Sequence, residues 1–208
     1  MTEIFVFGDS ITYGKWDAEK GGWVNRLNLD FDKKVIDSHF EEYFALYNLG
    51  IPGDTTQTLL HRFDSEIGTR YKEKGACVIL IAIGINDVQH FENENLTVSI
   101  EQSEENIRSI LSIAKEYANT IIVLGPTCVD ETRMLPCVWL DNVNYKNSDI
   151  QQYDTMLQTV CEQESISYVH LFDTLTNELL IDGIHPNAQG HEKLYTIIKK
   201  VLEEKRII

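Results

Sequence analysis

Short apolar runs alternate with longer amphipathic stretches along the whole chain. Each apolar run is mostly β-branched or aromatic, which is typical of strands that are buried in a sheet. Five segments fit this description: residues 4–7, 44–49, 77–83, 120–124 and, with a weaker pattern, 167–170. We expect these five segments to form strands.

Between the runs, apolar residues recur at helical spacing. Four stretches show this pattern: residues 56–71, 99–117, 150–164 and 188–204. We also expect Trp23 to begin the first helix and to pack inward. Strands that alternate with helices predict βαβ units around a parallel sheet, with right-handed connections.

Residues 126–149 do not follow this alternation. The segment has no clear period, yet it contains Met134, Leu135, Val138, Trp139 and Tyr145. Long irregular segments in compact domains are usually functional or disordered. The apolar content favours a wall or lid over a pocket. Since the sequence has no internal repeat and no Pro/Gly/Ser-rich linker, we expect a single domain over residues 1–208.

Polar segments that contain glycine follow the ends of the expected strands. They are Gly8-Asp9-Ser10, the segment from Gly50 to Thr56, Gly84-Ile85-Asn86-Asp87, and the segment from Asp182 to Pro186 before the last helix. In open α/β sheets, ligands bind beyond the carboxyl ends of the strands. The four segments are therefore expected to converge at one edge of the sheet.

The converging residues suit acyl-transfer chemistry. A serine becomes a good nucleophile when a base takes its proton, and a histidine does this best when a carboxylate orients it. Ser10, His185 and Asp182 fit these three roles. Donors for an oxyanion are available from the backbone N–H groups of Ser10 and Gly50 and from the Asn86 amide.

Each segment alone also has an ordinary structural explanation. Gly8-Asp9-Ser10 is a common helix N-cap, Gly50 and Gly53 suit turns, and Asn86-Asp87 suits an Asx-turn. The pair Asp182 and His185 suits a turn or half of a metal site. The occurrence of all four segments in this order, each at a strand end, favours a functional site.

The four blocks resemble those of the SGNH hydrolases, also called GDSL-type esterases and lipases. The blocks are FGDSITYG at 7–14, NLGIPGDTT at 48–56, GIND at 84–87 and DGIHP at 182–186, so the resemblance covers nearly the whole chain. It implies a three-layer α/β/α, flavodoxin-like fold with a central parallel sheet of about five strands. The residue after the serine is Ile11 where the family has leucine, and this changes no catalytic role.

The resemblance also implies roles for single residues. Ser10 is expected to be the nucleophile, His185 the general base and Asp182 its orienting carboxylate. Gly50 and Asn86 are expected to complete the oxyanion hole with Ser10. No cofactor and no metal are expected.

Related sequences act on lysophospholipids, acyl-thioesters, aryl esters and acetylated sugars, so the expected partner is a small-molecule ester. The apolar residues of 126–149 favour a small or medium acyl group, with Trp139 and Leu140 as candidate pocket residues. Trp16 is a further candidate for substrate contact, and His90 is a candidate for the edge of the pocket. A non-catalytic binding module is the alternative from another class, and the presence of both Ser10 and His185 favours catalysis.

The charge balance narrows the partners. Lys and Arg number 18 against 33 for Asp and Glu, a net charge of −15, which argues against nucleic acid and anionic membranes. The longest apolar run, residues 77–83, is too short to span a bilayer, and no leader sequence or interfacial helix is evident. We therefore expect a cytoplasmic protein without stable membrane anchoring. The sequence indicates no oligomeric state.

The cysteines do not form a recognisable motif. Cys77 and Cys161 lie in apolar patterns, as core residues do. Cys128 and Cys137 share one loop and can pair, although free thiols are expected in a cytosolic protein. No C-x-x-C or H-E-x-x-H is present, and the residues after Gly8 match neither a phosphate loop nor the α/β-hydrolase elbow.

Overall fold

In the computed structural model, which describes residues 1–91 and 95–208, five parallel strands form one sheet. The strands are β1 (Thr2–Gly8), β2 (Phe44–Gly50), β3 (Ala76–Ala82), β4 (Thr120–Leu124) and β5 (Ser167–Val169). They lie in the order β2-β1-β3-β4-β5, so the chain reverses its direction of winding at β1 and β3. The expected fold class is confirmed.

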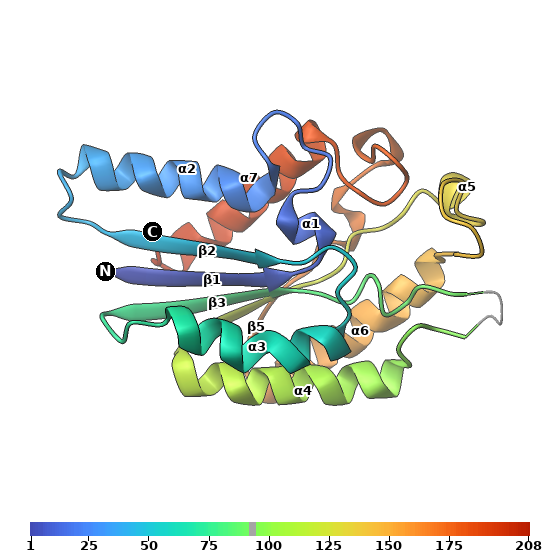
Figure 1. Ribbon diagram of the computed structural model, residues 1–208, viewed down its shortest axis with the longest axis horizontal. Helices are drawn as coiled ribbons and strands as arrows, with labels where there is room; N and C mark the ends of the chain where they lie inside the picture. The colour runs from blue at the N-terminus through green and yellow to red at the C-terminus, as the bar shows by residue number, and fades with distance from the viewer. Residues whose placement is uncertain (92–94) are drawn as a thin grey trace.

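Helices cover both faces of the sheet (Figure 1). One face carries α2 (Gly22–Asp37) and α7 (Ala188–Glu204), and the other carries α3 (Thr56–Arg70), α4 (Ile100–Tyr117) and α6 (Asn147–Glu164). The short helices are α1 (Ser10–Tyr13), α5 (Glu131–Met134) and the 3₁₀ turns η1 (Phe172–Thr174) and η2 (Asn177–Leu179).

Side-chain alternation along the strands explains the three layers. In β1, Phe5 and Phe7 pack into the core on the α3–α4–α6 side, whereas Ile4 and Val6 pack into the core beneath α2 and α7. Because both faces of the strand are buried, its sequence is a continuous apolar run and not an alternating one.

The observed elements lie close to the predicted ones. The strand expected to end at residue 170 ends at Val169, and the helix expected from residue 150 begins at Asn147. Trp23 is buried, as expected, but it lies in the second helix, because the one-turn helix α1 precedes it. All four cysteines are free, and Cys128 donates its thiol hydrogen to the carbonyl of Leu175.

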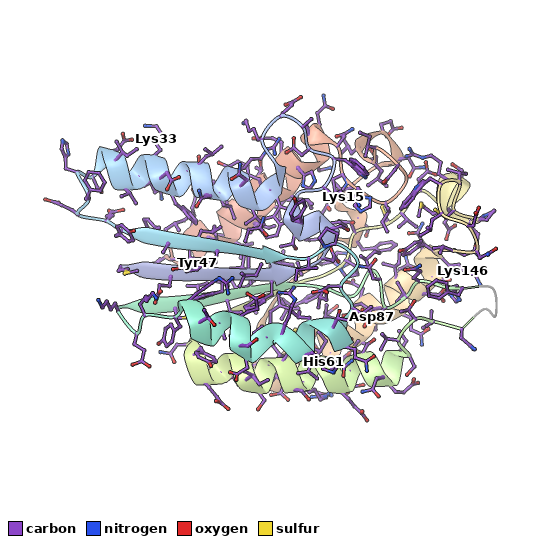
Figure 2. All side chains as sticks on the ribbon, viewed as in Figure 1. Lys15, Lys33, Tyr47, His61, Asp87 and Lys146 are labelled. Carbon is purple, nitrogen blue, oxygen red and sulfur yellow. The ribbon has the colours of Figure 1, made fainter. Side chains whose placement is uncertain are left out.

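The register of the sheet places the polar segments at one edge. Gly8 at the end of β1 pairs with Gly50 of β2 on one side and with Ala82 of β3 on the other, so these three strands end together. Figure 2 shows Lys15 and Asp87 at this edge, beyond the arrowheads of the strands. The parallel sheet thus brings distant segments of the chain together.

Candidate active site

A one-turn helix holds Ser10 at the end of β1. The Asp9 side chain caps this helix by accepting the backbone N–H of Ile11 at 2.9 Å, and Gly14 ends it with a φ of 93°. Gly8 permits the tight turn, since an added Cβ would lie 2.4 Å from the carbonyl oxygen of Ala82. The result is a buried serine whose backbone N–H lies in the first turn of a helix, where it has no partner within the helix.

Three of the predicted residues form one hydrogen-bonded chain. The Nε2 atom of His185 lies 2.9 Å from the Oγ of Ser10, and its Nδ1 lies 2.7 Å from Oδ2 of Asp182. Ser10 and His185 are 175 positions apart in the sequence, and both are buried. The geometry is that of a nucleophile, a base and an orienting carboxylate within hydrogen-bond distance.

The carboxylate of Asp182 is fully engaged. Its Oδ1 accepts the backbone N–H groups of Ile184 at 3.1 Å and His185 at 2.8 Å. Its Oδ2 accepts the indole N–H of Trp16 at 2.9 Å in addition to the imidazole. Burial acts to raise the pKa of Asp182, but the hydrogen bonds from the side chain and backbone of His185 outweigh it and lower this pKa to about 2. Asp182 is therefore ionised at neutral pH.

Asn86 lies in the loop after β3, and its side chain is buried. One of its amide hydrogens goes to the carbonyl of Asp54 at 2.8 Å, which holds the side chain against the loop after β2. An amide carries two hydrogens, so the second remains for another acceptor. The structure thus brings Asn86 to the sheet edge at which Ser10 lies, as predicted.

Gly50 does not offer the predicted donor. Its N–H donates to the side-chain oxygen of Asn48 at 3.1 Å, and its Cα is pressed against α1, where an added Cβ would lie 2.4 Å from the nitrogen of Tyr13. Gly50 is a packing residue between β2 and α1.

Gly53, which lies in the loop after Gly50, has a backbone N–H that could serve as this donor. Its φ is 86°, an added Cβ would meet nothing within 4 Å, and its N–H has no hydrogen bond among the residues that the structure describes. The sequence contains both glycines, and only the backbone geometry distinguishes them.

The segment 126–149 is an ordered wall beside the site. Met134, Val143 and Tyr145 are buried in the core, which anchors the segment. It bonds to the loop that carries Asp182, because the N–H of Asp130 donates to the carbonyl of Gly183 at 2.8 Å. Of the two predicted alternatives, a wall or a lid, the structure shows a wall that is packed against the rest of the protein.

Trp139 projects from this wall toward Asp182 and His185. Its indole N–H donates to the backbone carbonyl of Asp182 at 3.0 Å, and its ring centroid lies 6.2 Å from that of His185. Trp139, Trp16, Ile181 and Asp182 line an open, largely apolar cleft of about 320 Å³. Leu140, the other predicted pocket residue, does not line this cleft. His90, predicted at the edge of the pocket, does not line it either, and its Nε2 lies 2.6 Å from Oδ2 of Asp149.

Within residues 1–91 and 95–208, no three or more His, Cys, Asp or Glu side chains are grouped so that they could hold a metal ion. No helix in these residues has the length and apolar character needed to cross a membrane.

Comparisons with known proteins agree with this architecture. A lipase/acylhydrolase from Enterococcus faecalis is 26% identical and superposes with a TM-score of 0.73 over 99% of this chain and 97% of that one. An acetylxylan esterase from Geobacillus stearothermophilus is 20% identical, with a TM-score of 0.69 over 95% and 92% of the two chains.

The sequence comparisons agree. A multidomain esterase from Ruminococcus flavefaciens is 24% identical over 92% of this chain, and the match spans 27% of that protein's length. The model of the GDSL-like lipase/acylhydrolase family matches residues 6–193. This match covers all four motif blocks and confirms the resemblance, so the chain belongs to the GDSL-like lipase/acylhydrolase family, which groups it with enzymes that act on ester bonds.

Proposed function

We propose that this protein is a serine esterase that hydrolyses carboxylic esters or thioesters of small to medium acyl groups. The observation that carries the proposal is the chain of hydrogen bonds from Ser10 through His185 to Asp182, with separations of 2.9 Å and 2.7 Å. Family membership supports the reaction class, and the triad supports a covalent acyl-enzyme route.

The proposed reaction has two steps. The Oγ of Ser10 attacks the ester carbonyl while Nε2 of His185 takes its proton, and the protonated imidazole then gives that proton to the leaving alcohol or thiol. A water molecule next attacks the acyl-enzyme with His185 again as the base, which releases the acid and restores Ser10. Asp182, ionised at neutral pH, stabilises the imidazolium in both steps.

The proposed oxyanion hole has three donors. The N–H of Ser10 lies in the first turn of α1. The first amide hydrogen of Asn86 holds its side chain to Asp54, and the second has no acceptor among the described residues. We assign the third donor to Gly53 in place of Gly50, because the N–H of Gly50 is already engaged with Asn48. The hydrogen bond to Asp54 holds the Asn86 amide in place before substrate binds, as electrostatic stabilisation of the transition state requires.

The cleft suits a modest apolar substituent, since the two indoles and Ile181 supply its walls. The net charge of −15 disfavours polyanionic substrates at low salt. A cytoplasmic location is part of this proposal, and the four free thiols support it, because disulfides are rare in that compartment.

A direct test compares hydrolysis of p-nitrophenyl acetate, butyrate and octanoate by the wild type, Ser10→Ala and a matched control, Ser109→Ala. Ser109 is exposed on α4, where its hydroxyl donates to the carbonyl of Glu105. We expect only Ser10→Ala to lose turnover, and a serine-directed phosphonate to label Ser10 in the wild type. Turnover that survives Ser10→Ala refutes the mechanism. A wild type that neither turns over nor reacts with the phosphonate points to a binding module.

The cleft favours one second candidate, an esterase that removes acetyl groups from carbohydrates. Two indole faces and an isoleucine form broad apolar walls against which a sugar ring can lie. This candidate predicts a higher kcat/KM for acetylated xylooligosaccharides than for p-nitrophenyl acetate, with Trp139→Ala lowering only the former. Equal losses on both substrates argue against it.

A further inference from the structure

The loop from Gly14 to Gly22 is built around one buried carboxylate. Asp17 accepts the backbone N–H groups of Glu19, Lys20 and Gly22 and forms a buried ion pair with Arg26 of α2. At the base of the loop, Gly14 and Gly22 touch so closely that a Cβ on Gly22 would lie 2.3 Å from the Cα of Gly14. The loop is therefore held in one shape by its own side chain and by α2.

Trp16 occupies an unusual place in this loop. Its φ is 69°, a left-handed conformation that an aromatic residue adopts only when the surroundings impose it. Its ring is half exposed, with the ammonium of Lys15 5.1 Å from the ring centroid, so core packing does not explain its position. Figure 2 shows Lys15 beside α1, at the carboxyl edge of the sheet.

The only polar atom of the indole points at the triad. Nε1 of Trp16 donates to Oδ2 of Asp182 at 2.9 Å, the same oxygen that lies 2.7 Å from Nδ1 of His185. The other oxygen already accepts two backbone N–H groups. Trp16 therefore supplies the fourth donor to this carboxylate, and the only one from outside residues 182–185 among the hydrogen bonds of the described chain.

We propose that Trp16 is a positioning residue of the active site, which fixes the Asp182 carboxylate and shares its charge with His185 through the common oxygen. This proposal rests on the proposed function, in which His185 is the base. The indole fixes the orientation of Oδ2 toward the imidazole. It also withdraws part of the negative charge that would otherwise stabilise the imidazolium, because two donors divide one acceptor atom.

The sign of the effect follows from this division. When the indole N–H is removed, the carboxylate acts on His185 alone and stabilises the protonated imidazole more strongly. The base then becomes available only at higher pH. At the same time the carboxylate loses one of its fixed contacts, so the imidazole is oriented less well and kcat falls.

Trp139 provides a matched control. It is also a half-exposed tryptophan on the wall of the same cleft, and its indole N–H also bonds to Asp182, but to the backbone carbonyl and not to the carboxylate. Trp16→Phe and Trp139→Phe each keep an aromatic ring and delete one indole N–H. Only the first deletion touches the charged group.

The other charged groups are the same in both variants. Among the described residues, His185 interacts electrostatically with Asp9, just after β1, and with His191 on α7, and Asp182 interacts with Tyr145 in the segment 126–149. Lys15 lies against the Trp16 ring, and Trp16→Phe keeps an aromatic ring at that position. A difference between the two variants is therefore attributable to the bond on the carboxylate.

The experiment measures three quantities for the wild type, Trp16→Phe and Trp139→Phe: kcat and kcat/KM for p-nitrophenyl acetate, each against pH, and the titration midpoint of the His185 imidazole by NMR. For Trp16→Phe we expect the acidic limb and the midpoint to move upward by some tenths of a pH unit and kcat to fall several-fold. For Trp139→Phe we expect the limb and the midpoint to stay in place, whatever happens to KM.

Two results overturn the proposal: an unchanged midpoint in Trp16→Phe, or equal displacement in both variants. The NMR titration needs no turnover. A wild type that is inactive on esters therefore contradicts the proposed function, while the displacement of the midpoint still decides the role of Trp16.

Discussion

The carboxylate of Asp87 accepts the backbone N–H of Thr56 at 3.0 Å, so the loop after β3 is joined to the first turn of α3. The same carboxylate accepts the hydroxyl of Ser103 at 2.8 Å and that of Thr56. Burial raises the pKa of Asp87 to about 6, although these hydrogen bonds act in the opposite direction. Asn86, the adjacent residue, is therefore carried by a loop with a buried anchor.

Replacing Asp87 with alanine is expected to lower both stability and activity. The change leaves the N–H of Thr56 and the hydroxyl of Ser103 buried without a partner, and an unpaired buried polar group costs about 1–3 kcal/mol. Urea unfolding measures the loss, and Ser103→Ala, which removes a single donor, is the control with a smaller effect. An Asp87→Ala variant as stable as the wild type contradicts the anchoring role.

Asp9 makes stability depend on pH. Burial raises its pKa from 3.8 to about 7. Between these two pKa values the folded protein holds a proton on Asp9 that the unfolded chain has released. The stability that Asp9 contributes is therefore fully present below about pH 4 and is lost as the pH rises through about 7. At about 1.4 kcal/mol for each pH unit, the loss between pH 5 and pH 8 is about 3 kcal/mol.

Asp9→Asn keeps a side-chain acceptor for the N–H of Ile11 and removes this titration. We therefore expect the stability of Asp9→Asn relative to the wild type, measured as the difference in the free energy of unfolding, to be higher at pH 8 than at pH 5. Asp17→Asn is the control. Burial acts to raise the pKa of Asp17, but the Arg26 guanidinium and three backbone N–H groups lower it to about 2, so its cost is equal at both pH values. If the free energies of unfolding of Asp9→Asn and the wild type differ by the same amount at both pH values, the titration assigned to Asp9 is wrong.

The sequence predicts the sheet well because strands that are buried on both faces are continuous apolar runs, which are easy to recognise. Residues 4–7 and 120–124 are continuous apolar runs, and both lie in the sheet as expected. For the segment 126–149 the sequence predicts a wall or lid over a pocket, but it does not predict the shape of the segment. Its shape depends on distant partners, such as the bond from Asp130 to Gly183, which no local pattern encodes.

The same distinction holds in the site. Ser10 and Asn86 lie shortly after the ends of β1 and β3, and His185 lies in a recognisable block just before α7, so their convergence could be predicted. The choice between Gly50 and Gly53 could not, because it depends on whether the N–H is already engaged, and the side chain of Asn48 decides that. The hydrogen bond from Trp16 to Asp182 joins residues 166 positions apart, and Trp16 lies outside every block.

Removal of the Asn86 side chain tests the proposed oxyanion hole. We expect Asn86→Ala to lower kcat by about 10²–10³ with little change in KM, because the donor acts on charge that develops in the transition state. Tyr145→Phe is the control. It removes only the hydroxyl that lies 3.5 Å from Oδ1 of Asn86, and the bond from Asn86 to the carbonyl of Asp54 remains. Equal losses of kcat in the two variants place the effect in the loop and not in the amide.

Trp139→Ala tests whether the cleft holds the acyl chain. Trp139 lines the cleft and Leu140 does not, although both are half exposed and adjacent in sequence, so Leu140→Ala is a matched control. Butyrate has two more methylenes than acetate, and each buried methylene contributes about 0.8 kcal/mol. If the indole covers them, Trp139→Ala lowers the butyrate-to-acetate ratio of kcat/KM several-fold, up to about fifteenfold. Leu140→Ala leaves this ratio near that of the wild type. A ratio that is unchanged in Trp139→Ala, with an altered preference among leaving groups, assigns the cleft to the alcohol side of the ester.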